Sequence, residues 1–237
     1  MAIPTGRIRA LPQGGHRTLA EKAFSALHDA IVRGELAPGS RLRIEDLAHE
    51  LEMSPMPIRE ALRRLDAAGL VEHVPHRGAR VTQLSMPDLR EIYDVRLALE
   101  PLAVRHACER FDEADARAAR ESLDRHVRAY KRGDLREAWA AHTDFHFTLY
   151  RASESHWLIR LITPLWESSE RYRLAWLPIQ RHLGERRAEH ERILEACARR
   201  DADRAAVELH DHLARTANLV AQQMGGQALF ALVGPSA

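Results

Sequence analysis

The sequence predicts a mainly α-helical protein in which an N-terminal winged helix-turn-helix precedes a C-terminal all-α helical bundle. Two observations support this prediction. Residues 18–83 show three short helical patterns followed by two β-branched runs around a turn, and residues 85–223 keep a helical hydrophobic spacing throughout. We therefore expect a flexible arm over 1–16, a small domain over 17–83, an all-helical domain over 85–224 and a loose tail over 225–237.

The first two helices of the small domain are short. Thr18 and Glu21 have the spacing of a capping box at the start of the first helix, and Gly34 marks its end. A turn over 36–39 separates this helix from a second one over 44–51. The apolar face of the first helix is predicted to contain Leu19, Ala23, Leu27 and Ile31.

The third helix begins after Ser54, which is a good N-cap residue. Pro55 suits the first helical position, Pro57 still lies in the first turn, and Gly69 ends the helix. Two β-branched runs over 71–74 and 79–83 then flank a turn that carries a histidine and an arginine. This is the layout of a winged helix-turn-helix, with a hairpin whose tip is basic.

Six helices are predicted in the second domain, separated by turn residues such as Asp112, Gly133 and Asp201. Their ranges are 86–109, with a kink at Pro101, then 113–131, 134–152, 155–176, which contains Pro164, 184–199 and 202–223.

The composition is that of an ordinary globular protein, with 45% hydrophobic and 29% charged residues. No apolar run reaches the roughly 18–20 residues that a membrane-spanning helix needs, and the first residues do not read as a signal peptide. Cys108 and Cys197 fit a reducing compartment as small buried residues. We therefore expect a cytoplasmic protein with no membrane partner. The net charge of +1 neither supports nor excludes a nucleic-acid ligand.

Basic residues on the third helix and at the hairpin tip are candidates for binding double-stranded DNA. Arg59, Arg63 and Arg64 share the exposed face of the helix, and Arg59 is the nearest to its start. Such a face is often only solvated, but a capped third helix beside a basic wing can reach a major groove and adjacent phosphates. The predicted DNA-binding residues are Ser54, Met56, Pro57, Arg59, Arg63, His76, Arg77 and Gly78.

Longer motifs resemble known families over residues 18–223. The segments 36–42, 53–65 and 74–81, including the string Pro57-Ile-Arg-Glu-Ala-Leu62, resemble the DNA-binding domain of GntR-family transcription regulators. The helical half resembles the FCD effector domain of the FadR subgroup. Its matching residues are Asp94, Arg96, Glu100, Phe145, His146, His190, Glu191, Leu194 and His212.

This resemblance implies a homodimeric, metabolite-responsive repressor that binds an inverted-repeat operator and is released from it by a small carboxylate effector. The chain departs from the family pattern in two places. Many relatives have Arg and Thr where this chain has Pro55 and Met56, so its operator cannot be inferred from theirs. The family usually has Asp or Asn at the position of His142.

Four histidines are candidate ligands of a divalent metal ion. His142 and His146 stand four residues apart and so project from one face of a helix, whereas His190 and His212 lie on the last two helices. The spacing alone also fits structural histidines, but the resemblance implies that all four are metal ligands. Imidazole ligands suit Zn²⁺, Ni²⁺ or a similar ion. The nearby Asp144 and His210 are expected to point away from the site.

Arg96 lies on a mostly apolar helix face and therefore needs a buried partner. One interpretation is an internal ion pair with Asp94 or Glu100. The other, which the resemblance implies, is a bidentate clamp on the carboxylate of an organic-acid effector. Tyr172 and Arg173 are further candidates for the effector site, although they also fit a solvated helix face.

Two other functions have to be weighed. His190 and Glu191 begin a pattern found on zinc-protease helices, but Leu194 stands where the second histidine would fall, and no nucleophile motif or phosphate-binding loop is present. We therefore predict that the protein is not an enzyme. The helical domain could alternatively serve only for dimerisation, with structural histidines.

Overall fold

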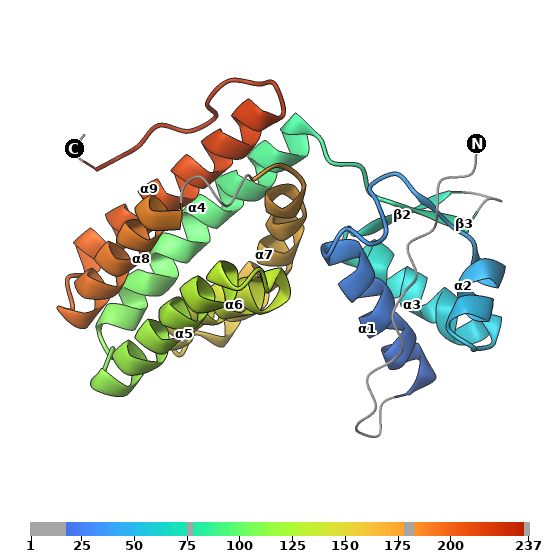
Figure 1. The fold of residues 1–237 in the computed structure, drawn as a ribbon, viewed down its shortest axis with the longest axis horizontal. Helices are drawn as coiled ribbons and strands as arrows, with labels where there is room; N and C mark the ends of the chain where they lie inside the picture. The colour runs from blue at the N-terminus through green and yellow to red at the C-terminus, as the bar shows by residue number, and fades with distance from the viewer. Residues whose placement is uncertain (1–17, 75–77, 178–182, 235–237) are drawn as a thin grey trace. The chain divides into compact units, whose positions relative to one another are not determined.

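The computed structural model describes residues 18–74, 78–177 and 183–234. By packing, the chain divides into two compact units. One comprises the described residues up to Ser85 together with Glu167–Ala175, and the other comprises Met86–Trp166 and the described residues from Trp176 onward. Helices dominate, and a small sheet occurs in the first unit, so the predicted fold class is confirmed (Figure 1).

The first unit contains three N-terminal helices and a three-stranded sheet. The helices are α1 (Leu19–Val32), α2 (Ile44–Glu50) and α3 (Pro55–Ala67), and the strands are β1 (Arg41–Leu42), β2 (Val71–Val74) and β3 (Gly78–Val81). The capping box predicted at Thr18 and Glu21 is present. Ser54 is the N-cap of α3, although its side chain makes no capping hydrogen bond.

The central strand β3 pairs antiparallel with both β1 and β2. The predicted hairpin is therefore present, but β3 begins at Gly78 and ends at Val81 rather than extending over 79–83. Strand β1 has no counterpart in the sequence-based prediction, because two residues between a turn and a helix are too few to show an alternating pattern.

The helices and the sheet of the first unit share one apolar core, in which Leu27, Ile58 and Val81 are fully buried. Leu19 differs from its prediction, since its side chain is 53% exposed. It is the first residue of α1, and a first-turn residue can lie beyond the part of its helix that packs. Ala23, one turn further along, is buried as predicted.

Six longer helices follow, and their bounds agree with the predicted ranges to within two residues. They are α4 (Met86–Cys108), α5 (Glu113–Lys131), α6 (Leu135–Arg151), α7 (His156–Trp176), α8 (Leu183–Ala198) and α9 (Ala202–Gln223). In the second unit α4 packs against α6, α8 and α9, while α5 packs against α6 and α8 (Figure 1). Among the described residues no helix is both long and apolar enough to span a membrane.

The second half of α7 belongs by packing to the first unit, whereas the sequence assigns the whole helix to the second domain. Arg171 donates a hydrogen bond to the backbone carbonyl of Thr82. The Tyr172 hydroxyl accepts from the backbone N–H of Ser85 and donates to its carbonyl. Helical periodicity cannot reveal that half of α7 packs in the first unit, because periodicity identifies the buried face of a helix but not the element that covers that face.

Within the predicted tail, residues 226–234 are held by hydrogen bonds rather than loose. Residues 226–234 lack regular secondary structure, yet the side chain of Asn218 on α9 makes three hydrogen bonds to the backbone of residues 229 and 230. The Asp211 carboxylate accepts two more from the backbone N–H groups of residues 233 and 234. The segment therefore runs along α9 (Figure 1). Such bonds have no periodic signature in the sequence.

Gly78→Ala should destabilise the hairpin. Gly78 has φ +86°, and a Cβ there would lie 2.8 Å from the carbonyl oxygen of Leu42, so the substitution adds a backbone clash to a strained conformation. Gly69→Ala is the matched control, since Gly69 also has a positive φ but an added Cβ would meet nothing within 4 Å. In thermal unfolding followed by circular dichroism, we expect losses of about 1 kcal/mol for Gly69→Ala and roughly 2–3 kcal/mol for Gly78→Ala. Equal losses would contradict this account.

Candidate functional site

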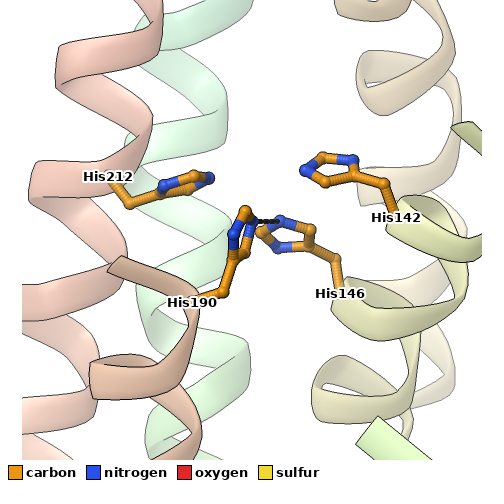
Figure 2. Close-up of side chains that lie close together, drawn as sticks. All are labelled: His142, His146, His190 and His212. Carbon is orange, nitrogen blue, oxygen red and sulfur yellow. Dashed lines mark hydrogen bonds between the residues drawn. The ribbon is translucent and has the colours of Figure 1, made fainter. Parts of the chain in front are cut away.

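Four histidines from three helices meet in the interior of the second unit. His142 and His146 come from α6, His190 from α8 and His212 from α9, and none is more than 5% exposed. One potential ligand atom from each lies within 4.8 Å of the others. Figure 2 shows the four side chains converging on one small region. We call these four residues the histidine cluster.

The protons of His190 and His212 are positioned by acceptors outside the cluster. His190 Nδ1 lies 2.7 Å from the carbonyl oxygen of Arg186, one turn earlier on α8, and His212 Nδ1 lies 2.8 Å from the Glu189 carboxylate. Burial disfavours the charged form of Glu189, but the hydrogen bond from His212 and nearby positive charge outweigh it, so the pKa of Glu189 lies below its usual value. Because a carbonyl or carboxylate oxygen only accepts, both Nδ1 atoms donate and each Nε2 keeps a lone pair.

His146 is positioned through Tyr150 and an ion pair on α4. The Tyr150 hydroxyl donates to the Glu100 carboxylate, so its oxygen can accept from His146 Nδ1, 3.1 Å away. Glu100 also accepts two hydrogen bonds from Arg96, at 2.6 and 3.2 Å, and both side chains are buried. His146 therefore also carries its proton on Nδ1 and keeps a lone pair on Nε2.

The facing nitrogens of His146 and His190 fit a metal ion. Their Nε2 atoms are 3.1 Å apart, and with each proton on Nδ1 two lone pairs meet without a hydrogen between them. A cation relieves this repulsion, and two nitrogens that each lie about 2.0–2.1 Å from one zinc ion can be this close. Burial and the neighbouring imidazoles His212 and His126 hold the pKa of His190 well below its usual value, which keeps the ring neutral and able to bind metal.

Two residues beside the cluster do not stand out in the sequence. His126 on α5 lies with its ring centroid 5.4 Å from that of His142. His126 and Arg186 line a small pocket together with His142 and His190. His126 has no second histidine at helical spacing, and Arg186 lies in a charged run, so neither shows a signal that marks a site.

Arg96, a predicted clamp for an effector carboxylate, already binds a carboxylate of its own chain. Arg96 forms an ion pair with Glu100, which is the first of the two interpretations of the sequence, an internal ion pair. Asp94, the other predicted partner, lies 4.0 Å from Arg90 instead. Transfer of Arg96 to a ligand would leave Glu100 as a buried charge without its cation, which costs about 3–5 kcal/mol. The structure therefore does not support Arg96 as the clamp.

Tyr172 and Arg173, the other candidates for the effector site, do not belong to the unit that contains the histidine cluster. Both are buried rather than solvated, and both lie in the half of α7 that belongs to the first unit. Tyr172 bonds to the backbone of Ser85, and Arg173 donates to Glu170 at 3.3 Å.

The predicted DNA-binding residues of α3 lie mainly on its exposed face. Ser54, Arg59 and Arg63 are exposed, Met56 is 72% exposed, and Pro57 is half-buried. Arg59, Arg63 and Gly78 line one groove, so α3 and the start of β3 contribute to one surface. His76 and Arg77 lie outside the described residues.

Three further arginines of the first unit have identified neighbours. Arg64 is exposed, as predicted, and stacks over the ring of Phe24 on α1, 4.3 Å from its centroid. Arg41 of β1 is directly opposite Arg80 of β3. Like charges in this position repel, and a phosphate between them would relieve the repulsion. The sequence did not mark Arg41, because β1 itself is too short to recognise.

Comparison with known proteins gives matches over both units. Residues 19–81 match the model of bacterial regulatory proteins of the gntR family, and residues 91–215 match that of the FCD domain. The transcriptional regulator BphR of Paraburkholderia xenovorans is 35% identical over 225 residues, covering 90% of this chain and 89% of its own. The transcriptional repressor GlaR of Escherichia coli is 29% identical over 208 residues, covering 84% of this chain and 94% of its own.

Solved structures agree with these matches. The structure of E. coli McbR/YncC has a TM-score of 0.77 and 25% identity, and the match covers 88% of this chain and 99% of that one. The structure of a GntR regulator from Rhodococcus sp. RHA1 has a TM-score of 0.72 and 26% identity, and the match covers 87% of this chain and 97% of that one.

His212→Ala should remove bound Zn²⁺ and lower the melting temperature of the metal-loaded protein, because an ion in the cluster joins α6, α8 and α9. His210→Ala is the matched control: it lies on the same helix, but its Nδ1 is 3.2 Å from the Asp211 carboxylate. Metal content by mass spectrometry, with melting curves before and after treatment with EDTA, checks both variants. Full retention of Zn²⁺ by His212→Ala would show that the cluster is not the metal site.

Proposed function

The chain belongs to the GntR family of bacterial transcription regulators and carries an FCD domain, and from this we infer that it is a metabolite-responsive repressor. We propose that a small organic acid, bound at a metal ion in the histidine cluster, releases it from its operator. The observation that carries the proposal is the buried cluster itself, in which partners outside the cluster hold the Nδ1 protons of His146, His190 and His212 and leave their Nε2 lone pairs free to bind a metal ion.

His142, His146, His190 and His212 would hold the ion. All-imidazole coordination suits Zn²⁺ or Ni²⁺, and the bound ion would supply a Lewis-acidic position for a carboxylate oxygen. The hydrogen bonds that Tyr150, Arg186 and Glu189 accept from three cluster histidines also weigh against a helical domain that serves only for dimerisation. Packing alone does not require the tautomers of three imidazoles to be fixed.

The first unit would bind DNA through α3 and the hairpin. A single winged helix-turn-helix reads only a few base pairs, so we propose a homodimer on an inverted repeat, where two-fold symmetry supplies the second half-site. A repressor role is supported by the name of GlaR, which describes a repressor. DNA as the ligand also supports the expected cytoplasmic location.

Arg59→Ala should weaken operator binding about 10-fold or more, equivalent to about 1–3 kcal/mol if the guanidinium contacts a base. Arg64→Ala is the control on the same helix, because Arg64 stacks on Phe24. Fluorescence anisotropy at several salt concentrations, on a duplex selected from random sequences by the purified protein, measures both. Equal affinities of Arg59→Ala and the parent would exclude Arg59 from the interface.

An organic acid should weaken operator binding at least 10-fold in the metal-loaded protein and have no effect after metal removal. The acid can act only by binding the DNA-free arrangement more tightly than the DNA-bound one. Anisotropy titrations with succinate, L-malate and D-gluconate, with His190→Ala as the control, test this. Tightened operator binding on addition of the acid would reverse the proposed direction of regulation.

A further inference from the structure

Met56, at the start of α3, is an apolar side chain that lies mostly in solvent. It is 72% exposed, more than any other large hydrophobic residue that the structure describes. Single exposed apolar residues are common on protein surfaces, but the position of this one is unusual. Met56 is the second residue of the helix that would enter the major groove, and the first residues of such a helix are those that reach the base edges.

Met56 shares one face of α3 with two arginines. Arg59 and Arg63 follow it three and seven residues later, which is the spacing of a single helix face, and all three side chains are exposed. The residues of α3 that pack in the core lie on the opposite side of the helix, and they are Ile58, Ala61, Leu62 and Leu65. The exposed face therefore starts with an apolar group and continues with two cations. A ligand that matches it has an apolar edge beside anionic groups, as a DNA base pair has beside its phosphates.

The first turn of α3 is poorly suited to bind a phosphate by itself. Pro55 and Pro57 have no N–H, so two of the donors that a helix start usually offers to an anion are missing. The surface that remains is apolar, since Pro55 and Met56 are exposed and Pro57 is half-buried. An apolar surface matches the C5-methyl group of thymine, which is the apolar group that a base pair presents in the major groove.

We infer that Met56 is a specificity-determining residue, and that it contacts the C5-methyl group of a thymine in each half-site of the operator. The flexible, polarisable thioether chain can adjust to the methyl group, while Arg59 and Arg63 would bind base edges or phosphates beside it. Cytosine is disfavoured at this position, because it has no methyl group. This inference rests on the proposed function, because it assumes that α3 faces the major groove.

Replacement of thymine by deoxyuridine tests the inference, because it removes the methyl group and leaves the base pair unchanged. The duplex is the one that the purified protein selects from random sequences, and each thymine is replaced in turn, in both half-sites together. Fluorescence anisotropy measures the Kd. We expect at least one position at which deoxyuridine raises the Kd of the parent about 5–20-fold, as the loss of two buried methyl groups should.

Variants of Met56 assign that effect to its side chain. Met56→Ala should raise the Kd for the thymine duplex by a similar factor and should no longer distinguish thymine from deoxyuridine at that position. Met56→Leu keeps an apolar side chain and should keep the distinction. Leu19→Ala is the matched control, because Leu19 is another exposed apolar residue of the first unit, and it should bind both duplexes as the parent does.

The outcomes separate the inference from the function on which it rests. If the parent selects no duplex, the proposed DNA binding fails together with the inference. If the parent binds its duplex but tolerates deoxyuridine at every position, or if Met56→Ala still distinguishes the two bases, Met56 does not read the methyl group, while the DNA-binding function stands. Should Met56→Ala not fold, Met56→Gln decides: it keeps the length of the side chain but has a polar end, so loss of the distinction supports the contact and its persistence overturns it.

Discussion

The buried ion pair between Arg96 and Glu100 is the constraint on which the interior of the helical unit depends. Burial penalises both charges, but the proximity of Glu100 outweighs this for Arg96 and keeps its pKa above the usual value. Glu100 also accepts from Tyr150, whose oxygen in turn lies 3.1 Å from His146 Nδ1. The same bonds that satisfy the buried charges on α4 therefore set the tautomer of a cluster histidine on α6.

Helix bounds could be predicted because their signals are local, whereas the set of four cluster histidines was predicted from the family resemblance. Capping residues and turn residues mark the ends of helices, and the four-residue spacing of His142 and His146 places both on one face. For Arg96 the sequence left an internal ion pair and an effector clamp both open, and the surroundings of Tyr172 and Arg186 could not be predicted in this way. Whether an arginine meets a carboxylate one turn away or faces a pocket depends on its rotamer and on helices distant in sequence, and periodicity contains neither.

The arginines of this chain show how neighbours decide the role of a residue type. Arg59 and Arg64 lie on one helix, yet Arg59 lines the groove beside the hairpin while Arg64 packs on an aromatic ring. Arg186 and Arg187 are adjacent, yet only Arg187 has carboxylate partners. Sequence periodicity also cannot predict how residues 229–234 are held, because Asn218 and Asp211 bind their backbone through hydrogen bonds rather than apolar contacts.

The segment between the hairpin and the helical unit is short and is held at both ends. β3 ends at Val81 and α4 begins at Met86. Arg171 bonds to the carbonyl of Thr82, and Tyr172 bonds to both backbone groups of Ser85. Arg171 and Tyr172 belong to the half of α7 that packs in the first unit, so these bonds fix the backbone that follows β3 within that unit.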